Sequence, residues 1–235
     1  MNLIRPAFAL TAAIAMAALV TLATTACVGA PTTSRTTATS GITTNGLEKK
    51  SPADVLLEAA AALKAAKSVH IVATSAGAGH VDMRLQGGSS TGTFTLSGAQ
   101  LKFTIIGSDG YVKANQAGLK QFGVPRPVQR HGAGRWLKVP ASGFTGLTLA
   151  DFASQLTKYY GPLEPKVRQA TLNGRKVVVI SWRDGGKMHV ANTGPAYPLR
   201  AEFKGQYPAL IEFSEYGAPL HITAPRNAID FSDAG

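Results

Sequence analysis

Cysteine is almost absent from this chain: Cys27 is its one cysteine in 235 residues. An intrachain disulfide is therefore excluded, and a folded domain must be held together by its core alone. Acidic residues are also scarce, with 13 Asp and Glu against 24 Lys and Arg, which gives a formal net charge of +11. A balance this basic favours an anionic partner.

Recognisable catalytic motifs are missing too. The sequence has no Gly-x-Ser-x-Gly or Ser-x-x-Lys nucleophile motif and no phosphate-cradling glycine loop. Acids are too scattered to indicate a paired-carboxylate site. The five histidines lack metal-ligand spacing and are expected at the surface: His70, His80, His131, His189 and His221. We therefore expect a non-catalytic protein with no cofactor and no metal.

The N-terminus follows the plan of a signal peptide over residues 1–26. Arg5 precedes an apolar run of residues 7–22, and small residues lead up to Cys27. The run is short and rich in alanine, so removal is favoured over a stable membrane span. Cleavage before Cys27 with lipidation of its thiol is the first expectation, although Thr24 stands where lipoprotein signals usually have leucine. Plain secretion with a free thiol is the alternative.

Residues 27–50 would begin the mature chain at the lipidated Cys27. They continue as a Thr- and Ser-rich segment that lacks apolar periodicity. Such a composition is typical of a flexible tether. Residues 51–235 then form one domain, which we expect on the outer face of the cytoplasmic membrane, anchored through Cys27, or secreted. Nucleic acid is not an expected partner in that location.

The domain opens with an amphipathic helix. Ser51 is a candidate N-cap, Pro52 suits the first turn, and Asp54 favours the positive end of the helix dipole. A second helix is expected from Thr148, ended by the Gly161-Pro162 pair. The apolar stripes of the two helices contain Val55, Leu56, Ala59, Ala62, Leu63 and Ala66 in the first, and Leu149, Phe152, Leu156 and Tyr159 in the second.

Alternating apolar and polar residues predict about five strands after each helix. In the second set, Asn173-Gly174 predicts a hairpin with a type I′ turn. Residues 116–135 are expected to be a loop with one helical turn. A long antiparallel sheet must curl. We therefore predict an α+β fold: a strongly curved antiparallel sheet, a half-barrel of about ten strands, with two or three helices on its concave face.

Several segments resemble a known family. They are Asp109-Gly110-Tyr111-Val112-Lys113, the strand Trp136-Leu137-Lys138-Val139, and the ending from Phe213-Ser214-Glu215-Tyr216-Gly217-Ala218-Pro219 through Pro225. With the order of helices and strands, residues 51–230 resemble the LolA-like superfamily, and most of all the LppX/LprG-type lipoproteins of actinobacterial envelopes. The resemblance implies a U-shaped sheet that holds acyl chains of envelope lipids beneath its helices and helps to move them outward.

The resemblance yields a first hypothesis and an alternative. The first is a carrier for an envelope lipid or lipoglycan, with an export transporter or envelope enzyme as a further partner. The alternative is the same fold with a filled core, acting as a structural or protein-binding lipoprotein. An apolar cavity larger than about 300 Å³ would favour the carrier.

Candidate residues follow from the apolar faces of the expected elements. The ligand-binding candidates are Val55, Leu56, Ala59, Leu63, Met83, Leu85, Phe94, Leu96, Phe103, Ile105, Phe152, Leu156, Phe203 and Phe213. Packing of these side chains as an ordinary core is the simpler interpretation. Basic residues around the mid-chain loop are candidates for contact with lipid head groups, namely Arg126, Arg130 and Arg135. A solvated basic loop is the competing interpretation.

Overall fold

The computed structural model describes residues 43–76, 79–121, 124, 126–144, 146–158, 161–204 and 208–231. Cys27, the expected signal peptide and most of the expected tether lie outside these residues. Within the described ranges, none of the helices has the length and apolar character needed to cross a bilayer.

The first half of the domain is a helix followed by a meander of strands. The 3-10 helix η1 (Leu47–Lys49) precedes α1 (Pro52–Ala65). Ser51 caps α1 as predicted, because its Oγ accepts a hydrogen bond from the Asp54 N–H at 3.1 Å. The strands that follow are β1 (Ser68–Ser75), β2 (Gly79–Gln86), β3 (Ser89–Leu96), β4 (Ala99–Ile106), β5 (Asp109–Ala114) and β6 (Leu137–Pro140).

The second half repeats this order. The 3-10 helix η2 (Ala141–Gly143) leads to α4 (Leu149–Lys158), which Thr148 caps through the Asp151 N–H. The strands after it are β7 (Arg168–Leu172), β8 (Arg175–Ser181), β9 (Lys187–Ala191), β10 (Pro198–Phe203), β11 (Ala209–Ser214) and β12 (Ile229–Asp230). Asn173 and Gly174 have φ of 49° and 76°, which confirms the type I′ turn.

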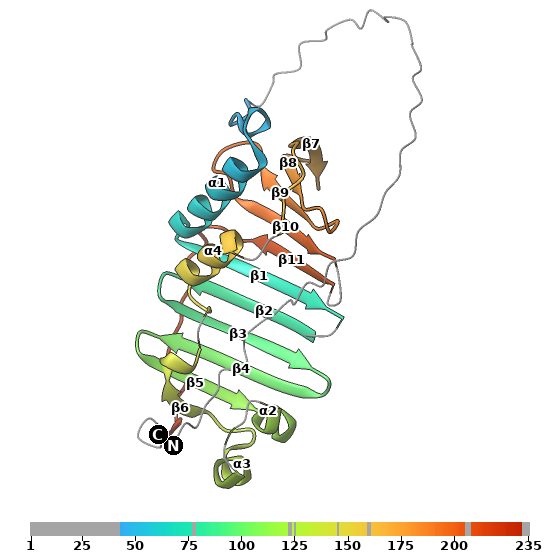
Figure 1. The fold of residues 1–235 in the computed structure, drawn as a ribbon. Helices are drawn as coiled ribbons and strands as arrows, with labels where there is room; N and C mark the ends of the chain where they lie inside the picture. Colours follow the sequence, from blue (N-terminus) through green and yellow to red (C-terminus); the bar gives the residue numbers. More distant parts are fainter. Residues whose placement is uncertain are drawn as a thin grey trace, which may run out of the picture.

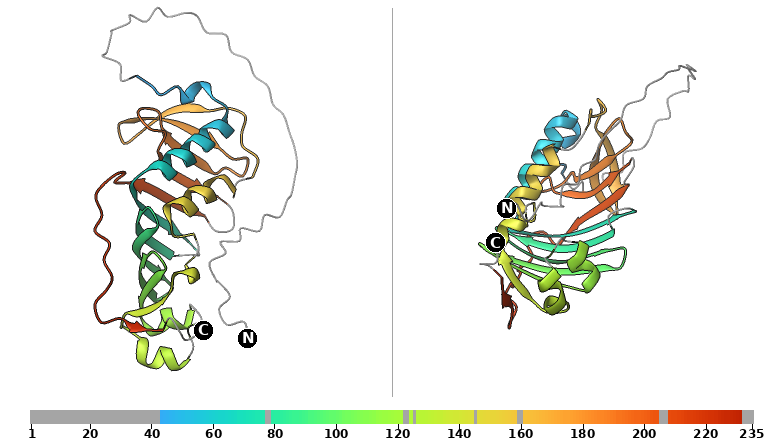
Figure 2. Two further views of the ribbon diagram at one scale, coloured as in Figure 1. Left: turned by 90° about the vertical axis from the view of Figure 1, so that its left-hand side faces the viewer. Right: turned by 60° about the horizontal axis from the view of Figure 1, so that its bottom comes forward.

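The two meanders share a single 12-stranded sheet in the order β12-β6-β5-β4-β3-β2-β1-β11-β10-β9-β8-β7. The antiparallel pair of β1 and β11 joins the two halves. The sheet is strongly curved and does not close, and α1 and α4 lie together over its concave face (Figures 1 and 2). The predicted α+β half-barrel is thus confirmed, with twelve strands where about ten were expected.

The folded domain begins earlier than residue 51, where the sequence placed its boundary. Asn45 donates its side-chain N–H to the carbonyl oxygens of Ala191 and Gly194, both at 3.0 Å. Leu47 is only 1% exposed and belongs to the main core. Residues 43–50 are therefore attached to the end of β9, because a buried leucine and backbone partners offset the cost of ordering a polar segment.

The middle of the chain is more helical than predicted. The residues expected as a loop with one turn form two short helices, α2 (Gln116–Gln121) and α3 (Arg126–Gly132). Their apolar residues are too few for a visible stripe, so tertiary contacts supply most of their stability.

One strand pair differs from the expected antiparallel pattern. After β11, the chain runs along the sheet to its far edge (Figure 2, left), and there β12 pairs in parallel with β6. The Ile229 and Phe231 N–H groups donate to the carbonyl oxygens of Trp136 and Lys138, both at 2.8 Å. This pairing across a long sequence separation has no signature in the local sequence.

Candidate functional site

The concave face is covered unevenly, and its cross-strand rows show this. One row runs through Phe213, Ile71, Met83, Gly92 and Phe103 on successive strands. Its four apolar side chains are at most 4% exposed. The ring of Phe152 on α4 lies 6.0 Å from that of Phe213, edge to face. This row, the inner row, is therefore buried, and α4 lies over its Phe213 end.

The neighbouring row on the same face is different. Ile211, Ala73, Val81 and Phe94 are direct cross-strand neighbours on β11, β1, β2 and β3. Each lies two residues from the inner row along its strand, so it points to the same side of the sheet. All four are half-buried, whereas the inner row is buried. We call these four residues the open row, because they remain in contact with solvent while the inner row is buried.

A cluster of cations lies at the end of the sheet to which the open row leads. Phe94 pairs with Leu101, and Leu101 pairs with Ala114 at the end of β5. The next residue, Asn115, directly precedes α2 and fixes this helix to the β3–β4 turn. Its Oδ1 accepts hydrogen bonds from the Gln100 and Gly118 N–H groups at 3.1 and 2.8 Å, and its Nδ2 donates to the Gly98 carbonyl at 2.8 Å.

Lys120 of α2, Arg126 and Arg130 of α3, and Arg135 just after α3 are all exposed. We call these four residues the basic corner. No acid occurs in the sequence between Asp109 and Asp151. Lys138, another cation of this segment, has acidic neighbours at 3.3 Å (Asp109) and 3.8 Å (Asp230). Its hydrogen bond to Asp109 raises its pKa, so it belongs to an ion-pair network.

Searches for a matching family model and for related curated proteins found none. Comparison with solved structures found LprF from Mycobacterium bovis, at 16% identity and a TM-score of 0.51, with 74% of this chain and 96% of that chain covered. This protein has the LppX/LprG-type fold. The lipoprotein LppX from Mycobacterium tuberculosis also matches, at 13% identity and a TM-score of 0.47, with 73% and 98% of the two chains covered.

Within this LppX/LprG-type fold, the fourteen ligand-binding candidates divide into two groups. Ten are buried and pack against one another in the main core. They are Val55, Leu56, Ala59, Leu63, Met83, Leu85, Phe103, Ile105, Leu156 and Phe213. The other four, Phe94, Leu96, Phe152 and Phe203, are half-buried. The sequence pattern identified the inward face but could not show which rows the helices would cover.

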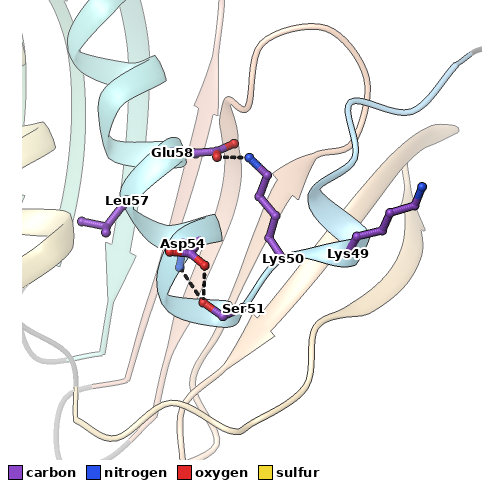
Figure 3. A pocket seen from close by; sticks show the side chains of 6 residues that line it. All are labelled: Lys49, Lys50, Ser51, Asp54, Leu57 and Glu58. Atoms are coloured by element: carbon purple, nitrogen blue, oxygen red, sulfur yellow. Dashed lines mark hydrogen bonds and ion pairs between the residues drawn. The ribbon is translucent and has the colours of Figure 1, made fainter.

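Two hollows among the described residues lie elsewhere. The first, about 440 Å³, lies at the start of α1 and is lined by Lys49, Lys50, Ser51, Asp54, Leu57 and Glu58 (Figure 3). Lys50 pairs there with Glu58, and Leu57 is 59% exposed. The second, about 130 Å³, is lined by Glu164, Pro165, Lys166, Arg168 and Ser181. Charged side chains dominate both, so neither has the lining expected of an acyl-chain cavity.

The outer face carries a polar cluster that sequence reasoning missed. His70 Nε2 lies 2.9 Å from Asp82 Oδ1, and its Nδ1 lies 3.4 Å from Ser214 Oγ and 3.5 Å from Glu215 Oε1. Arg84 Nε lies 3.3 Å from Glu215 Oε2. These groups lie on β1, on β2 and at the end of β11, so they join the two halves of the sheet.

Serine, histidine and aspartate are also the residue types of a hydrolase triad. Here, however, Ser214 and Glu215 both face the same nitrogen of His70. Neither of the two hollows includes any of these residues.

Within the described residues, no group of three His, Cys, Asp or Glu side chains is arranged to hold a metal ion.

Proposed function

We propose that this protein is a lipid-anchored, non-catalytic carrier of the outer face of the cytoplasmic membrane, and that it binds an acyl chain of an envelope lipid or lipoglycan. The open row carries the proposal. It offers four half-buried apolar side chains on adjacent strands, spanning three strand spacings or about 14 Å. A chain lying along it would remove these side chains from water, at about 0.8 kcal/mol for each methylene buried.

Other features support the same proposal. The half-buried candidates Phe94 and Leu96 lie on β3, beside the turn to which α2 is fixed. Arg126, Arg130 and Arg135 lie at that end of the sheet and would meet an anionic head group. The fold matches that of LprF. Cys27 would carry the anchor, and an export transporter or envelope enzyme would receive the cargo.

A second function, with the core filled, is favoured by one specific observation. Ten of the fourteen expected lining residues are buried among themselves. On this alternative the protein would be a structural or protein-binding lipoprotein, and the open row would contact a protein partner.

Binding of cis-parinaric acid, a fluorescent fatty acid, distinguishes these functions. Val81→Gln places an amide on the open row and should weaken binding at least tenfold, since part of the apolar contact is lost. Val72→Gln is the matched control: Val72 is also half-buried, but it lies on β1 and faces the outer side. The control should bind like the wild type.

Absence of binding in all three proteins, together with a bare mass after native extraction from an expressing host, would reject the carrier. Equal binding by all three would show that fatty acid binds away from the open row. A discrete lipid adduct in the native mass spectrum would identify the cargo class.

A further inference from the structure

The charge of this protein is concentrated at one end. Residues 83–150 contain eight Lys and Arg but a single acid, Asp109. Among the described residues, no ion pair involves the basic corner, Lys120, Arg126, Arg130 and Arg135. Four exposed cations without acidic neighbours in sequence generate a strong positive potential, which attracts an extended anionic surface.

This end is remote from the point where the chain leaves toward its expected anchor. The described chain starts at Thr43, and Asn45 is bonded to the end of β9. Seven strand spacings, or about 34 Å along the curved sheet, separate β9 from β5, where α2 begins. If the expected tether is flexible, 15 residues, the number from 28 to 42, would span about 20 Å on average and about 50 Å when fully extended.

These lengths limit how the domain can sit above a membrane. If the sheet stood upright on its tether, the basic corner would point away from the anchoring bilayer. If the sheet lay along the membrane, the corner and the point of tether attachment would reach the same surface without stretching the tether.

We propose that the basic corner docks on the surface of an anionic phospholipid bilayer, with the sheet lying along the membrane. A bilayer fits better than a soluble polyanion because an apolar element accompanies the cations. Trp136 is half-buried and directly follows Arg135, and tryptophan favours the interface between head groups and acyl chains. Docking rests on the lipid anchor of the proposed function, but it does not require the proposed chain binding.

Tryptophan fluorescence provides a direct readout. The chain has two tryptophans, and Trp182 is only 2% exposed. The full-length protein would be reconstituted through its own N-terminus into vesicles that carry a nitroxide on a lipid head group. One set contains phosphatidylcholine alone, and the other includes about a third phosphatidylglycerol. Attachment occurs in both, so quenching of Trp136 reports docking, and Trp136→Phe supplies the baseline.

The expected result is quenching in the anionic vesicles only, reversed by high salt because surface contacts are screened. The triple variant Arg126→Ser, Arg130→Ser, Arg135→Ser should lower the ratio of docked to undocked protein on the order of 100-fold, which abolishes quenching. The matched control is Arg168→Ser, Arg175→Ser, Arg183→Ser. It removes the same charge from exposed positions on and beside β7 and β8, and should be quenched like the wild type.

Three results would overturn the proposal. Equal quenching in neutral and anionic vesicles would show contact without charge recognition, and equal loss in both triple variants would show a mere net-charge effect. Binding of soluble polyphosphate without quenching by anionic vesicles would identify a polymer as the partner. Quenching of Val81→Gln separates this test from that of the proposed function: this substitution weakens chain binding on the open row and leaves the basic corner unchanged, so it should dock like the wild type.

Discussion

The two halves of the sheet differ in how their faces are covered. In the part from β8 to β10, Val177, Val178, Val179 and Ile180 of β8 are all buried. Val178 and Ile180 face the main core, while Val177 and Val179 belong to a second cluster on the outer face, where Tyr197 and Tyr216 stack at 3.9 Å. The half from β2 to β5 instead has a polar outer face and a concave face that is partly open.

This difference separates stability from recognition within one sheet. The part from β8 to β10, which is covered on both faces, holds the attachment of residues 43–50 and contacts α1. The part from β11 through β1 and β2 to β3 carries the open row, which leads to the basic corner. We therefore expect substitutions in β8 to β10 to affect mainly folding. Substitutions in the open row and the basic corner should affect mainly binding.

The largest expected effect is on stability in the covered half. Val178→Ala should lower the free energy of unfolding by about 2 kcal/mol, because Val178 is fully buried and its loss leaves a cavity. Val81→Ala removes the same atoms from the open row and should cost less than about 1 kcal/mol, since solvent already reaches that side chain. Urea denaturation of both variants measures the difference, and equal losses would remove the distinction between the halves.

The middle of the inner row provides a sharper test of packing. A Cβ at Gly92 would lie 2.7 Å from Met83 Cβ and 2.5 Å from the Asp82 carbonyl oxygen. Gly92→Ala should therefore lower the free energy of unfolding by about 1–2 kcal/mol through overpacking. Gly88→Ala, where nothing lies within 4 Å of the new Cβ, is the control and should be nearly neutral. If Gly92→Ala left the stability unchanged, the side chains on the concave face would be packed less tightly than the structure indicates.

The smallest expected effect concerns Tyr216, which stacks on Tyr197 at the outer face. Tyr216 donates its hydroxyl to the Pro198 carbonyl at 2.5 Å. Tyr216→Phe keeps the ring but loses this bond, so it should lower the free energy of unfolding at pH 7 by about 1 kcal/mol. Urea denaturation measures this change. An unchanged free energy of unfolding would show that the Tyr216 hydroxyl does not stabilise the fold.

The same substitution predicts a pH dependence. Burial raises the pKa of Tyr216. The unfolded phenol ionises near pH 10 while the folded one stays neutral, so wild-type stability is fully present below about pH 10 and declines above it. Tyr216→Phe should lack that part of the decline. Denaturation at pH 9 and pH 11 compares the two proteins, and parallel declines would contradict the assignment.

Much of the fold could be predicted from local patterns. The caps at Ser51 and Thr148 and the turn at Asn173-Gly174 have short-range causes, and the structure confirms them. Alternation predicted most of the strands because most of them have one apolar face, whereas β8 is apolar on both faces. The helices α2 and α3 were missed because Asn115 holds α2 through partners on another hairpin. No local pattern could predict the burial of Leu47 or the pairing of β12 with β6.

The candidate site shows the same limit. The sequence by itself determined which side chains face inward and that the positive charge is concentrated around residues 116–138, since both depend on residue type and strand period. Only the tertiary structure decided that the inner row is buried, with α4 over its Phe213 end, and that Ile211, Ala73, Val81 and Phe94 remain half-buried. Coverage depends on how far the sheet curves and where the helices pack upon it. Both result from contacts between residues that are distant in the chain.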